Sequence, residues 1–444
     1  MIKLNKKMRS ILLQQRQERD YLASKTYLKR HVEIHVDDYL KSNLIKVIIG
    51  PRRAGKSVFG LQMLQGTNYA YLNFDDNQLL KVFDESQIMQ VMQEVYPGFQ
   101  YLMLDEIQNL DGWERWVETL YRRGINMVIT GSNAKLLSSE LSSMLSGRYL
   151  QIEILPFSLT ENLRFFGITT TTDTPHERGV YMHEVDEYMH NGGYPEIIST
   201  RQLTETYLRG VYDTVLLKDI IQRYKIHKTD DLYNLAEWLG SNYTGLFTFS
   251  SLAEELGMTS KTTVSKYCSY LQQSYMFFYL PRFNNKLQLM KKAPQKVYMV
   301  DNGFVKAKAF GVSPDLGKLL ENMVFDELLH RGYAPGLTLY YYRSRNDKEA
   351  DFVLRQGNKV EQIVQVCYDL SSPKTYKREQ GALEETSEEL KCKNMCVVTW
   401  DTEGDMDVDG VKAPIISFEK WAEKSRLIMT DRVEADTRLR EWVG

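Results

Sequence analysis

One eight-residue stretch constrains this chain more than any other feature of its sequence. Residues 50–57 read Gly-Pro-Arg-Arg-Ala-Gly-Lys-Ser, which fits the pattern G-x-x-x-x-G-K-S at every constrained position. The stretch follows an apolar run at 44–49, so we expect a buried strand, a loop and then a helix. In such a loop the backbone N–H groups surround a β-phosphate, Lys56 reaches the β- and γ-oxygens, and the Ser57 hydroxyl ligates Mg2+. The residues predicted to contact ATP are Gly50, Pro51, Arg52, Arg53, Ala54, Gly55, Lys56 and Ser57.

A nucleotide hydrolase needs a second element, and a candidate follows about fifty residues later. The apolar residues 101–104 are followed by Asp105 and Glu106. We expect Asp105 to hold the magnesium shell and Glu106 to polarise the attacking water. The alternative is a strand whose exposed end carries two acids by coincidence, and the phosphate loop upstream makes that alternative the weaker one.

Two more residues are candidates for contacts with the γ-phosphate. Asn133 ends the next apolar strand, where its amide would orient the hydrolytic water; the alternative is an ordinary helix N-cap. Arg148 would stabilise charge on the γ-phosphate, either in its own chain or from a neighbouring subunit of a homo-oligomer. Its alternative is a purely structural role, which is common for arginine.

Composition limits the class of protein. With 444 residues and 43% hydrophobic content, the chain is long enough for about three domains of roughly 150 residues each. No stretch approaches the ~18 consecutive apolar residues of a membrane helix. The four cysteines are too few and too scattered for a disulfide framework or a zinc site. We therefore expect a cytoplasmic protein without a membrane partner.

A helix-turn-helix pattern occupies the middle of the chain. Residues 249–256 have the pattern of a capped amphipathic helix, a turn follows at Gly257, and residues 261–274 form a second helical pattern. The basic segment 282–296 contains no acid and would form a wing suited to the phosphates of double-stranded DNA, although the net charge of the chain is only −2. The alternative is a packing module whose basic wing pairs with the acidic tail. The candidate DNA contacts are Lys261, Lys266, Arg282, Lys286, Lys291, Lys292 and Lys296.

The last part of the chain has a pattern of acids that resembles the PD-(D/E)xK nuclease core. In that core two carboxylates hold Mg2+ and a lysine activates water. Glu321 lies on a predicted helix and Asp351 on a predicted strand, but Gln365 replaces the second strand acid and Cys367 replaces the lysine. A neutral amide is a poorer ligand for a hard cation, and a thiol with a pKa of ~8.5 is a poor substitute for an ammonium. A degenerate nuclease fold is therefore favoured over active DNA cleavage, and a coincidental resemblance is the third reading.

Six motifs in a fixed order give the chain a family resemblance from about residue 30 onward. The chain resembles the prokaryotic AAA-type ATPases that carry a C-terminal DUF4143 region, which implies an AAA+/STAND-like ATPase with a winged helix and a restriction-endonuclease-like end. The motifs lie at residues 50–57, 71–76 (Tyr-Leu-Asn-Phe-Asp-Asp), 104–108 (Leu-Asp-Glu-Ile-Gln), 130–133 (Thr-Gly-Ser-Asn), 192–196 (Gly-Gly-Tyr-Pro-Glu) and 349–353 (Glu-Ala-Asp-Phe-Val).

These observations predict an α/β fold class. We expect a P-loop NTPase parallel sheet with a helical lid, because strands and helical segments alternate, followed by a winged helix-turn-helix and a restriction-endonuclease-like α/β domain. The expected division is an N-terminal helical segment at 1–30, the AAA-type ATPase domain at 31–165, the lid at 166–235, the winged helix-turn-helix at 236–285 with its wing running to about 296, and the DUF4143 or PD-(D/E)xK-like domain at 286–444.

Three functions are compatible with the sequence. The favoured one is an ATP-binding and ATP-hydrolysing switch that acts on a DNA-engaging module. The second is an ATP-gated, Mg2+-dependent nuclease, which acts against foreign DNA. The third is a protein-interaction scaffold that uses the nucleotide only for stability.

Overall fold

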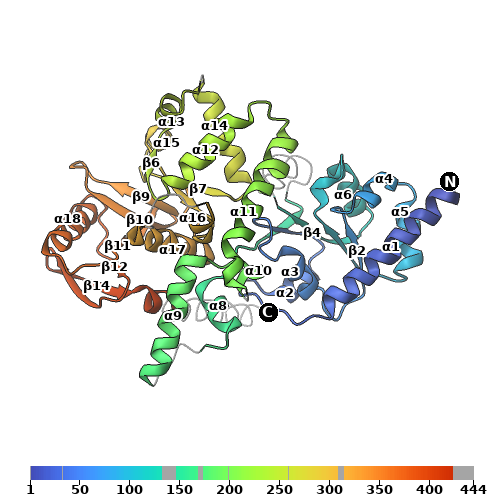
Figure 1. Ribbon diagram of the computed structural model, residues 1–444, viewed down its shortest axis with the longest axis horizontal. Helices are drawn as coiled ribbons and strands as arrows, with labels where there is room; N and C mark the ends of the chain where they lie inside the picture. Colours follow the sequence, from blue (N-terminus) through green and yellow to red (C-terminus); the bar gives the residue numbers. More distant parts are fainter. Residues whose placement is uncertain are drawn as a thin grey trace. The chain divides into compact units, whose positions relative to one another are not determined.

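The chain forms two compact units. The computed structural model describes residues 2–32, 34–132, 147–168, 174–198, 200–258, 260–308 and 315–423. Unit 1 comprises residues 1–156, 214–225 and 270–276, and unit 2 comprises residues 157–213, 226–269 and 277–444 (Figure 1). Two short segments from the middle of the sequence therefore belong with the N-terminal part of the chain.

A parallel sheet forms the centre of unit 1. Among the described residues its order is β2-β3-β4-β1-β5, and every neighbouring pair of strands is parallel. All of β1 is buried, which explains its continuous apolar run, because helices cover both faces of such a sheet. The prediction of a parallel α/β sheet is confirmed. The strands are β1 (Ile45–Ile49), β2 (Tyr69–Asn73), β3 (Tyr101–Asp105), β4 (Asn126–Gly131) and β5 (Tyr149–Glu153).

Helices pack around this sheet, and the N-terminal helix is one of them. Helix α1 contacts α5 and β2, with Met8 and Leu12 fully buried. The Gln15 amide donates hydrogen bonds of 3.1 Å to the Asn73 carbonyl and to Asp76. The N-terminal helical segment is thus an integral part of unit 1. The helices are α1 (Ile2–Ala23), α2 (Val36–Lys41), α3 (Lys56–Met63), α4 (Asn77–Val82), α5 (Ile88–Val95), η1 (Ile107–Asn109) and α6 (Trp113–Arg122).

Two later segments complete unit 1. They include the π-helical η4 (Val215–Gln222), which continues α11 (Thr204–Thr214), and the end of α14 (Lys261–Gln273). The ring of Tyr224 stacks on Tyr270 with centroids 3.6 Å apart, and its hydroxyl donates to Gln273 at 2.8 Å. The Tyr275 hydroxyl donates to Glu153 at the end of β5, also at 2.8 Å. These contacts hold the last turn of α14 to unit 1.

A pair of glycines in unit 2 allows a close approach of backbone segments. Gly192 has φ of 75°, and a Cβ there would lie 1.7 Å from a carboxylate oxygen of Asp301; a Cβ on Gly193 would lie 2.0 Å from the Phe157 carbonyl. The Gly193 N–H donates to Asp301 at 2.7 Å, and the buried Tyr194 follows directly. The motif at 192–196 therefore has a packing role. The first helices of this unit are α8 (Leu159–Phe165), α9 (Pro175–Asn191), α10 (Pro195–Ile198) and η3 (Arg201–Leu203).

The predicted helix-turn-helix lies next to a small sheet in unit 2. Its strands are antiparallel in the order β6-β8-β7. The segment expected to be an extended wing contains the helix α15, because its Leu, Gln, Met and Lys residues are strong helix formers. The residues of β8 fall in the range 286–444 expected for the last domain, but this strand pairs with β6 and β7 in the small sheet. The elements are α12 (Thr229–Ser241), β6 (Leu246–Phe247), α13 (Phe249–Glu255), α14, β7 (Phe277–Pro281), α15 (Leu287–Lys292), β8 (Gln295–Met299) and α16 (Gly303–Lys308).

The rest of unit 2 is a mixed sheet with two long helices. The strand order is β13-β14-β12-β11-β10-β9 in the described residues; β9, β10 and β11 are antiparallel neighbours, and β12 lies parallel to both β11 and β14. Helices α17 and α18 both pack on β11. The elements are α17 (Leu316–His330), β9 (Leu339–Arg343), β10 (Glu349–Gln356), β11 (Lys359–Val366), α18 (Pro373–Leu390), β12 (Met395–Thr399), β13 (Gly404–Val408) and β14 (Val411–Ser417).

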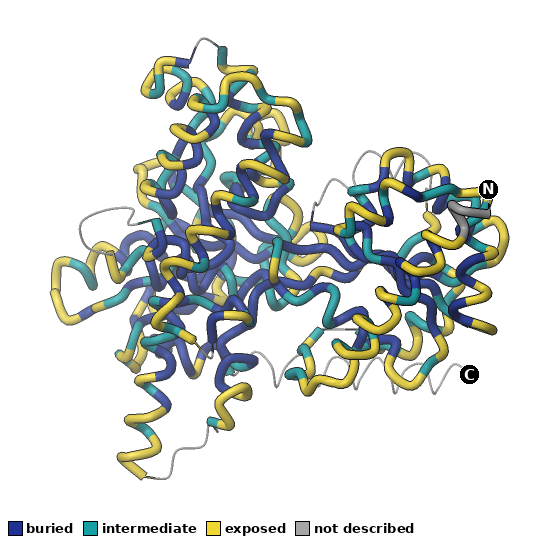
Figure 2. The backbone as a smooth tube through the Cα atoms, turned by 45° about the vertical axis from the view of Figure 1, so that its right-hand side comes forward, coloured by how far each residue is buried: buried dark blue, intermediate teal, exposed yellow. Residues whose placement is uncertain are grey.

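Burial is greatest on inner strands: all of β1 and all of β12 are buried, whereas most residues of the edge strands β5 and β13 are not. Figure 2 shows exposed residues recurring along the outer turns of the helices. No helix in the described parts of the chain combines the length and apolar character required to cross a bilayer.

Candidate nucleotide site and carboxylate cluster

The phosphate loop connects β1 to α3 and has a backbone that only certain residues adopt. Gly50 has φ of 143°, and a Cβ there would lie 1.9 Å from the Ile154 carbonyl, so the neighbouring backbone excludes any side chain. Gly55 has φ of 96°, and Arg53 has φ of 69°. Helix α3 begins at Lys56, directly after the loop. Its first N–H groups therefore face the loop, as the binding of an anion requires.

Lys56 is buried although it carries a charge. Its side chain is 3% exposed, and its Nζ donates to the Pro51 carbonyl at 2.8 Å and lies 3.9 Å from Glu106 Oε1. Burial lowers the pKa of Lys56, while the nearby carboxylates act in the opposite direction. The ammonium is thus fixed against the loop, where a phosphate would satisfy it.

Asp105 is the most strongly hydrogen-bonded acid of this site. It accepts from the Ser57 hydroxyl at 2.8 Å, from the Tyr71 hydroxyl at 2.9 Å and from the Thr130 hydroxyl. Burial raises the pKa of this carboxyl, and Glu106 beside it acts in the same direction. The structure therefore brings together the two predicted Mg2+ ligands, Ser57 and Asp105. No role was predicted for Tyr71 or Thr130, although they lie in the motifs at 71–76 and 130–133, respectively.

Protein side chains alone do not form a metal site here. In the described ranges, no group of three or more His, Cys, Asp or Glu residues has a metal-holding arrangement. Mg2+ in such proteins is held by one or two protein oxygens together with phosphate oxygens and water. The donor set of Ser57 and Asp105 fits that mode, in which metal and nucleotide bind together.

Glu106 occupies an unusual backbone position. Its φ is 50°, in the left-handed region, and its N–H donates to the Thr130 hydroxyl at 3.0 Å. Gln108 donates to its carboxylate. Strained backbone positions are concentrated at functional sites because the strain aims a side chain that an unstrained strand end would not. Gln108 was part of the motif at 104–108, but its contact with Glu106 was not predicted.

Asn133 and Arg148 are the two remaining catalytic candidates, and only Arg148 can be placed in the structure. Asn133 lies outside the described residues. Arg148 directly precedes β5, and its carbonyl accepts a hydrogen bond of 3.0 Å from the N–H of Ile45, the first residue of β1. The phosphate loop follows the last residue of β1, so the length of this strand, roughly 16 Å, separates the Arg148 backbone from the loop. Its guanidinium lies 3.9 Å from Glu118 and over the Tyr121 ring. A role of Arg148 at the phosphate of its own chain is therefore wrong, and a role in a neighbouring subunit stays a prediction.

Arg52 links the phosphate loop to the π-helical segment. Its guanidinium forms two hydrogen bonds with Asp219, of 2.8 and 3.0 Å. The Asp219 side chain is 5% exposed, and this contact raises the pKa of Arg52. A π-helical turn re-aims side chains compared with an α-helix and is frequent at functional sites. One side of the loop is therefore held by a segment more than 150 residues later in the sequence.

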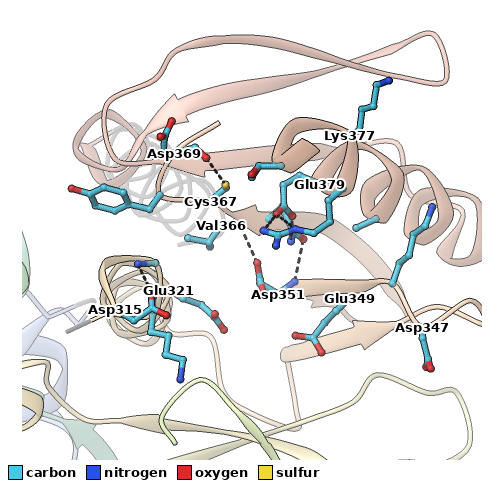
Figure 3. A pocket seen from close by; sticks show the side chains of 18 residues that line it. Asp315, Glu321, Asp347, Glu349, Asp351, Val366, Cys367, Asp369, Lys377 and Glu379 are labelled. Atoms are coloured by element: carbon cyan, nitrogen blue, oxygen red, sulfur yellow. Dashed lines mark hydrogen bonds and ion pairs between the residues drawn. The ribbon is translucent and has the colours of Figure 1, made fainter. Parts of the chain in front are cut away.

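The acids predicted for the nuclease-like site meet around a lysine. Lys296 on β8 lies 2.8 Å from Glu321, 2.8 Å from Glu349 and 2.9 Å from Asp351. The assignment of Lys296 as a DNA contact is therefore wrong, because its side chain is 3% exposed and is enclosed by carboxylates. Figure 3 shows Glu321, Glu349 and Asp351 approaching one another from α17 and β10.

A cavity of about 710 Å3 adjoins this cluster. Gln365 lies in its wall and donates to Glu379 of α18 at 2.7 Å, so the helix supplies an acid near the position at which the strand has an amide. Cys367 donates to the Asp369 carbonyl at 3.3 Å, and burial raises the pKa of its thiol to about 11. Glu379 was not identified from the sequence, because its distance from the other acids depends on how α18 packs.

Most of the other candidate DNA contacts lie on the surface of unit 2. Arg282 is half-buried: its guanidinium donates to the Arg343 carbonyl and lies over the Tyr342 ring. Among the described residues, the lysines of α15 form no ion pair with the acidic segments 384–389 and 401–409; Glu385 pairs with Lys348 and Asp405 with Lys412 instead. The alternative in which the basic wing pairs with the acidic tail is therefore not observed for these lysines. The exposed candidates are Lys261, Lys266, Lys286, Lys291 and Lys292.

Three protein families match consecutive parts of the chain. An AAA domain matches residues 42–163, the domain of unknown function DUF8612 matches 182–315, and the domain of unknown function DUF4143 matches 316–410. The second match ends at residue 315 and the third begins at residue 316. This boundary agrees with the structure, because β8 and α16 precede it and are not part of the six-stranded sheet.

Relatives extend this match over most of the chain. The uncharacterized protein MJ1544 of Methanocaldococcus jannaschii is 31% identical over 414 residues, which cover 89% of this chain and 91% of that protein. An uncharacterized protein of Haemophilus influenzae is 32% identical over 367 residues, covering 79% and 87%. Among solved structures, the chain is similar to the Walker-type ATPase PABY2304 of Pyrococcus abyssi, with 13% identity, a TM-score of 0.40 and coverage of 61% and 93%.

Proposed function

The chain belongs to the family of AAA-type ATPases with a C-terminal DUF4143 region, and we propose that it binds and hydrolyses ATP as a switch on a DNA-engaging module. The phosphate loop, the buried Lys56 and the Ser57–Asp105 pair support the nucleotide part of this proposal. The arrangement of α13, α14 and the small β6-β8-β7 sheet supports a winged helix.

Each residue of the site has a distinct task in hydrolysis. The loop N–H groups and Lys56 would hold the phosphates, and Ser57 and Asp105 would hold Mg2+, which would supply positive charge to neutralise the phosphates. Glu106, positioned by its left-handed backbone and by Gln108, orients and polarises the attacking water. Asn133 remains a candidate for orienting the same water, and Arg148 remains one for action on a neighbouring copy in a homo-oligomer.

The Arg52–Asp219 ion pair is the observation that carries the switch. The planar fork of Arg52 binds a carboxylate or a phosphate in the same bidentate way, so a γ-phosphate at the loop competes with Asp219 for it. Asp219 lies on η4, and Tyr224 just after η4 stacks on Tyr270 in α14. Nucleotide at the loop thereby biases the helix that carries the candidate DNA contacts Lys261 and Lys266.

The test is a coupling measurement on the parent protein. Duplex DNA affinity is measured with ADP and with a non-hydrolysable ATP analogue, and nucleotide affinity is measured with and without DNA. Binding linkage is reciprocal, so both experiments should return the same coupling factor, of about 5-fold or more. Equal DNA affinity in both nucleotide states, together with ATP hydrolysis unchanged by DNA, would contradict the switch and leave the scaffold alternative.

The order α17, β9, β10, β11, α18 and β12 supports a restriction-endonuclease-like arrangement for the last region. The residues of this region do not favour an ATP-gated nuclease. Gln365 and Cys367 still replace an acid and a lysine, and the remaining acids Glu321 and Asp351 are paired with Lys296. We propose that this region holds DNA or protein without cleaving it.

A further inference from the structure

Lys296 joins two regions of the chain that match different families. It lies on β8, within the residues that match DUF8612, whereas its three carboxylate partners lie within the DUF4143 match. All four residues belong to unit 2. The partners are also fixed by other groups: the Tyr298 hydroxyl donates to Glu321 at 2.8 Å, and the Val366 N–H donates to Asp351 at 3.0 Å.

Three oxygens converge on a single ammonium. Glu321 Oε1, Glu349 Oε1 and Asp351 Oδ1 all lie 2.8–2.9 Å from Lys296 Nζ. Burial disfavours the charged lysine, but the three carboxylates outweigh this effect and raise the pKa of Lys296 well above its ordinary value. Three carboxylates held this close together and partly withdrawn from water need a compensating cation, and here that cation is a side chain of the same protein.

We propose that Lys296 is the resident cation of this cluster, occupying the position at which the carboxylates would otherwise hold a divalent metal ion. The inference does not depend on the ATP-dependent switch. It has two consequences: the natural protein takes up no divalent ion between these acids, and the loss of the Lys296 ammonium converts the cluster into a metal site.

The geometry selects the ion for the test. Ca2+ binds carboxylate oxygens at about 2.3–2.6 Å, whereas Mg2+ requires about 2.0–2.1 Å in a nearly octahedral shell. The oxygens around Nζ would move inward by only a few tenths of an ångström for Ca2+. The adjoining cavity of about 710 Å3 provides an access route and room for the water ligands that complete the shell.

The experiment compares five nucleotide-free proteins by Ca2+ titration calorimetry and thermal unfolding: the parent, Lys296→Ala, Lys296→Ala/Asp351→Asn, Asp351→Asn and Lys46→Ala. The parent should show no saturable Ca2+ uptake and no Ca2+-dependent rise in Tm. Lys296→Ala should have a lower Tm than the parent, should bind one Ca2+ with a Kd on the order of 10−4 M, and should recover Tm when Ca2+ is added. The double variant Lys296→Ala/Asp351→Asn should lose this response, which locates the ion in the cluster.

Lys46→Ala is the matched control. Lys46 is also a buried lysine on a strand, but it donates to the Ser42 carbonyl and to Asn126, and in the described parts of the chain no carboxylate pairs with it. Its variant should lose stability without any response to Ca2+.

Three results would overturn the proposal. One is Ca2+ binding by the parent that Asp351→Asn removes. Another is a folded Lys296→Ala protein that does not respond to Ca2+. The third is a Lys296→Ala protein that cannot be refolded with Ca2+ present although Lys46→Ala folds, whereas refolding that requires Ca2+ supports the proposal.

Discussion

Tyr71 shows how a residue outside the phosphate loop supports Asp105, the acid that we predict to bind the metal ion. Its hydroxyl donates to Asp105, while the Ser57 hydroxyl donates to the other carboxylate oxygen. Asp105 thus has a fixed orientation before any ion binds. Groups that orient a metal ligand in this way typically contribute 10- to 100-fold to metal affinity or activity.

Tyr71→Phe should therefore raise the Mg2+ concentration needed for half-maximal ATP hydrolysis by about 10-fold, because Asp105 loses one of the donors that orient it. The control is Tyr96→Phe. The Tyr96 hydroxyl is also buried but donates to the Tyr71 carbonyl, so its removal should leave the Mg2+ dependence unchanged. Equal Mg2+ titrations for the parent and Tyr71→Phe would show that Tyr71 only fills space.

Lys56 and Glu106 should separate binding from hydrolysis. Lys56→Ala should abolish nucleotide binding, because it removes the buried ammonium that is held against the phosphate loop and is expected to reach the β- and γ-oxygens. Glu106→Gln should bind ATP but hydrolyse it at least ~100-fold more slowly in single-turnover assays, since an amide cannot accept a proton from water. Hydrolysis at the parent rate in Glu106→Gln would make the assignment of this acid wrong.

At the scale of elements, the sequence predicted what local patterns determine. The strand, loop and helix around Gly50 follow from an apolar run and two glycines, and both are local signals. The π-helical form of η4 was not predicted, because its amino-acid pattern resembles that of an ordinary α-helix and its wider turn depends on packing. The helix α15 was missed because basic residues were interpreted by charge rather than by helix propensity.

The stacked pair Tyr224 and Tyr270 should carry part of the coupling between nucleotide and DNA. Tyr270→Leu removes the stacking partner, so the ratio of DNA affinities in the ATP and ADP states should fall towards one. Tyr224→Phe keeps the stacked ring and loses the hydrogen bond that the hydroxyl donates to Gln273, so it should retain most of the coupling. Fluorescence titration of labelled duplex DNA in each nucleotide state measures both ratios. The same ratio for Tyr270→Leu and the parent would place the coupling elsewhere.

At the scale of the whole chain, long-range contacts limited what could be predicted. Glu321 and Asp351 were identified because acids at those places fit a known pattern, but nothing local shows that Lys296 lies between them, 25 and 55 residues away. Charge alone suggested that Lys296 faces DNA, whereas its position on a central strand places it inside. The same limit applies to Arg52 and Asp219, whose pairing depends on the return of a distant segment to unit 1.

The basic surface around α15 gives a test of DNA binding that does not involve the nucleotide site. Lys291 and Lys292 are exposed at the end of this helix, and phosphate contacts by lysine release counterions from DNA. Each lost contact should lower the slope of log affinity against log salt by about 0.9, so Lys291→Ala/Lys292→Ala should reduce it by up to about two units. ATP hydrolysis without DNA should not change. The control Lys6→Ala/Lys7→Ala removes the same charge from an exposed part of α1 in unit 1, and it should leave the slope unaltered. An equal loss of slope in both double variants would mean that net charge, and not the α15 surface, determines the attraction to DNA.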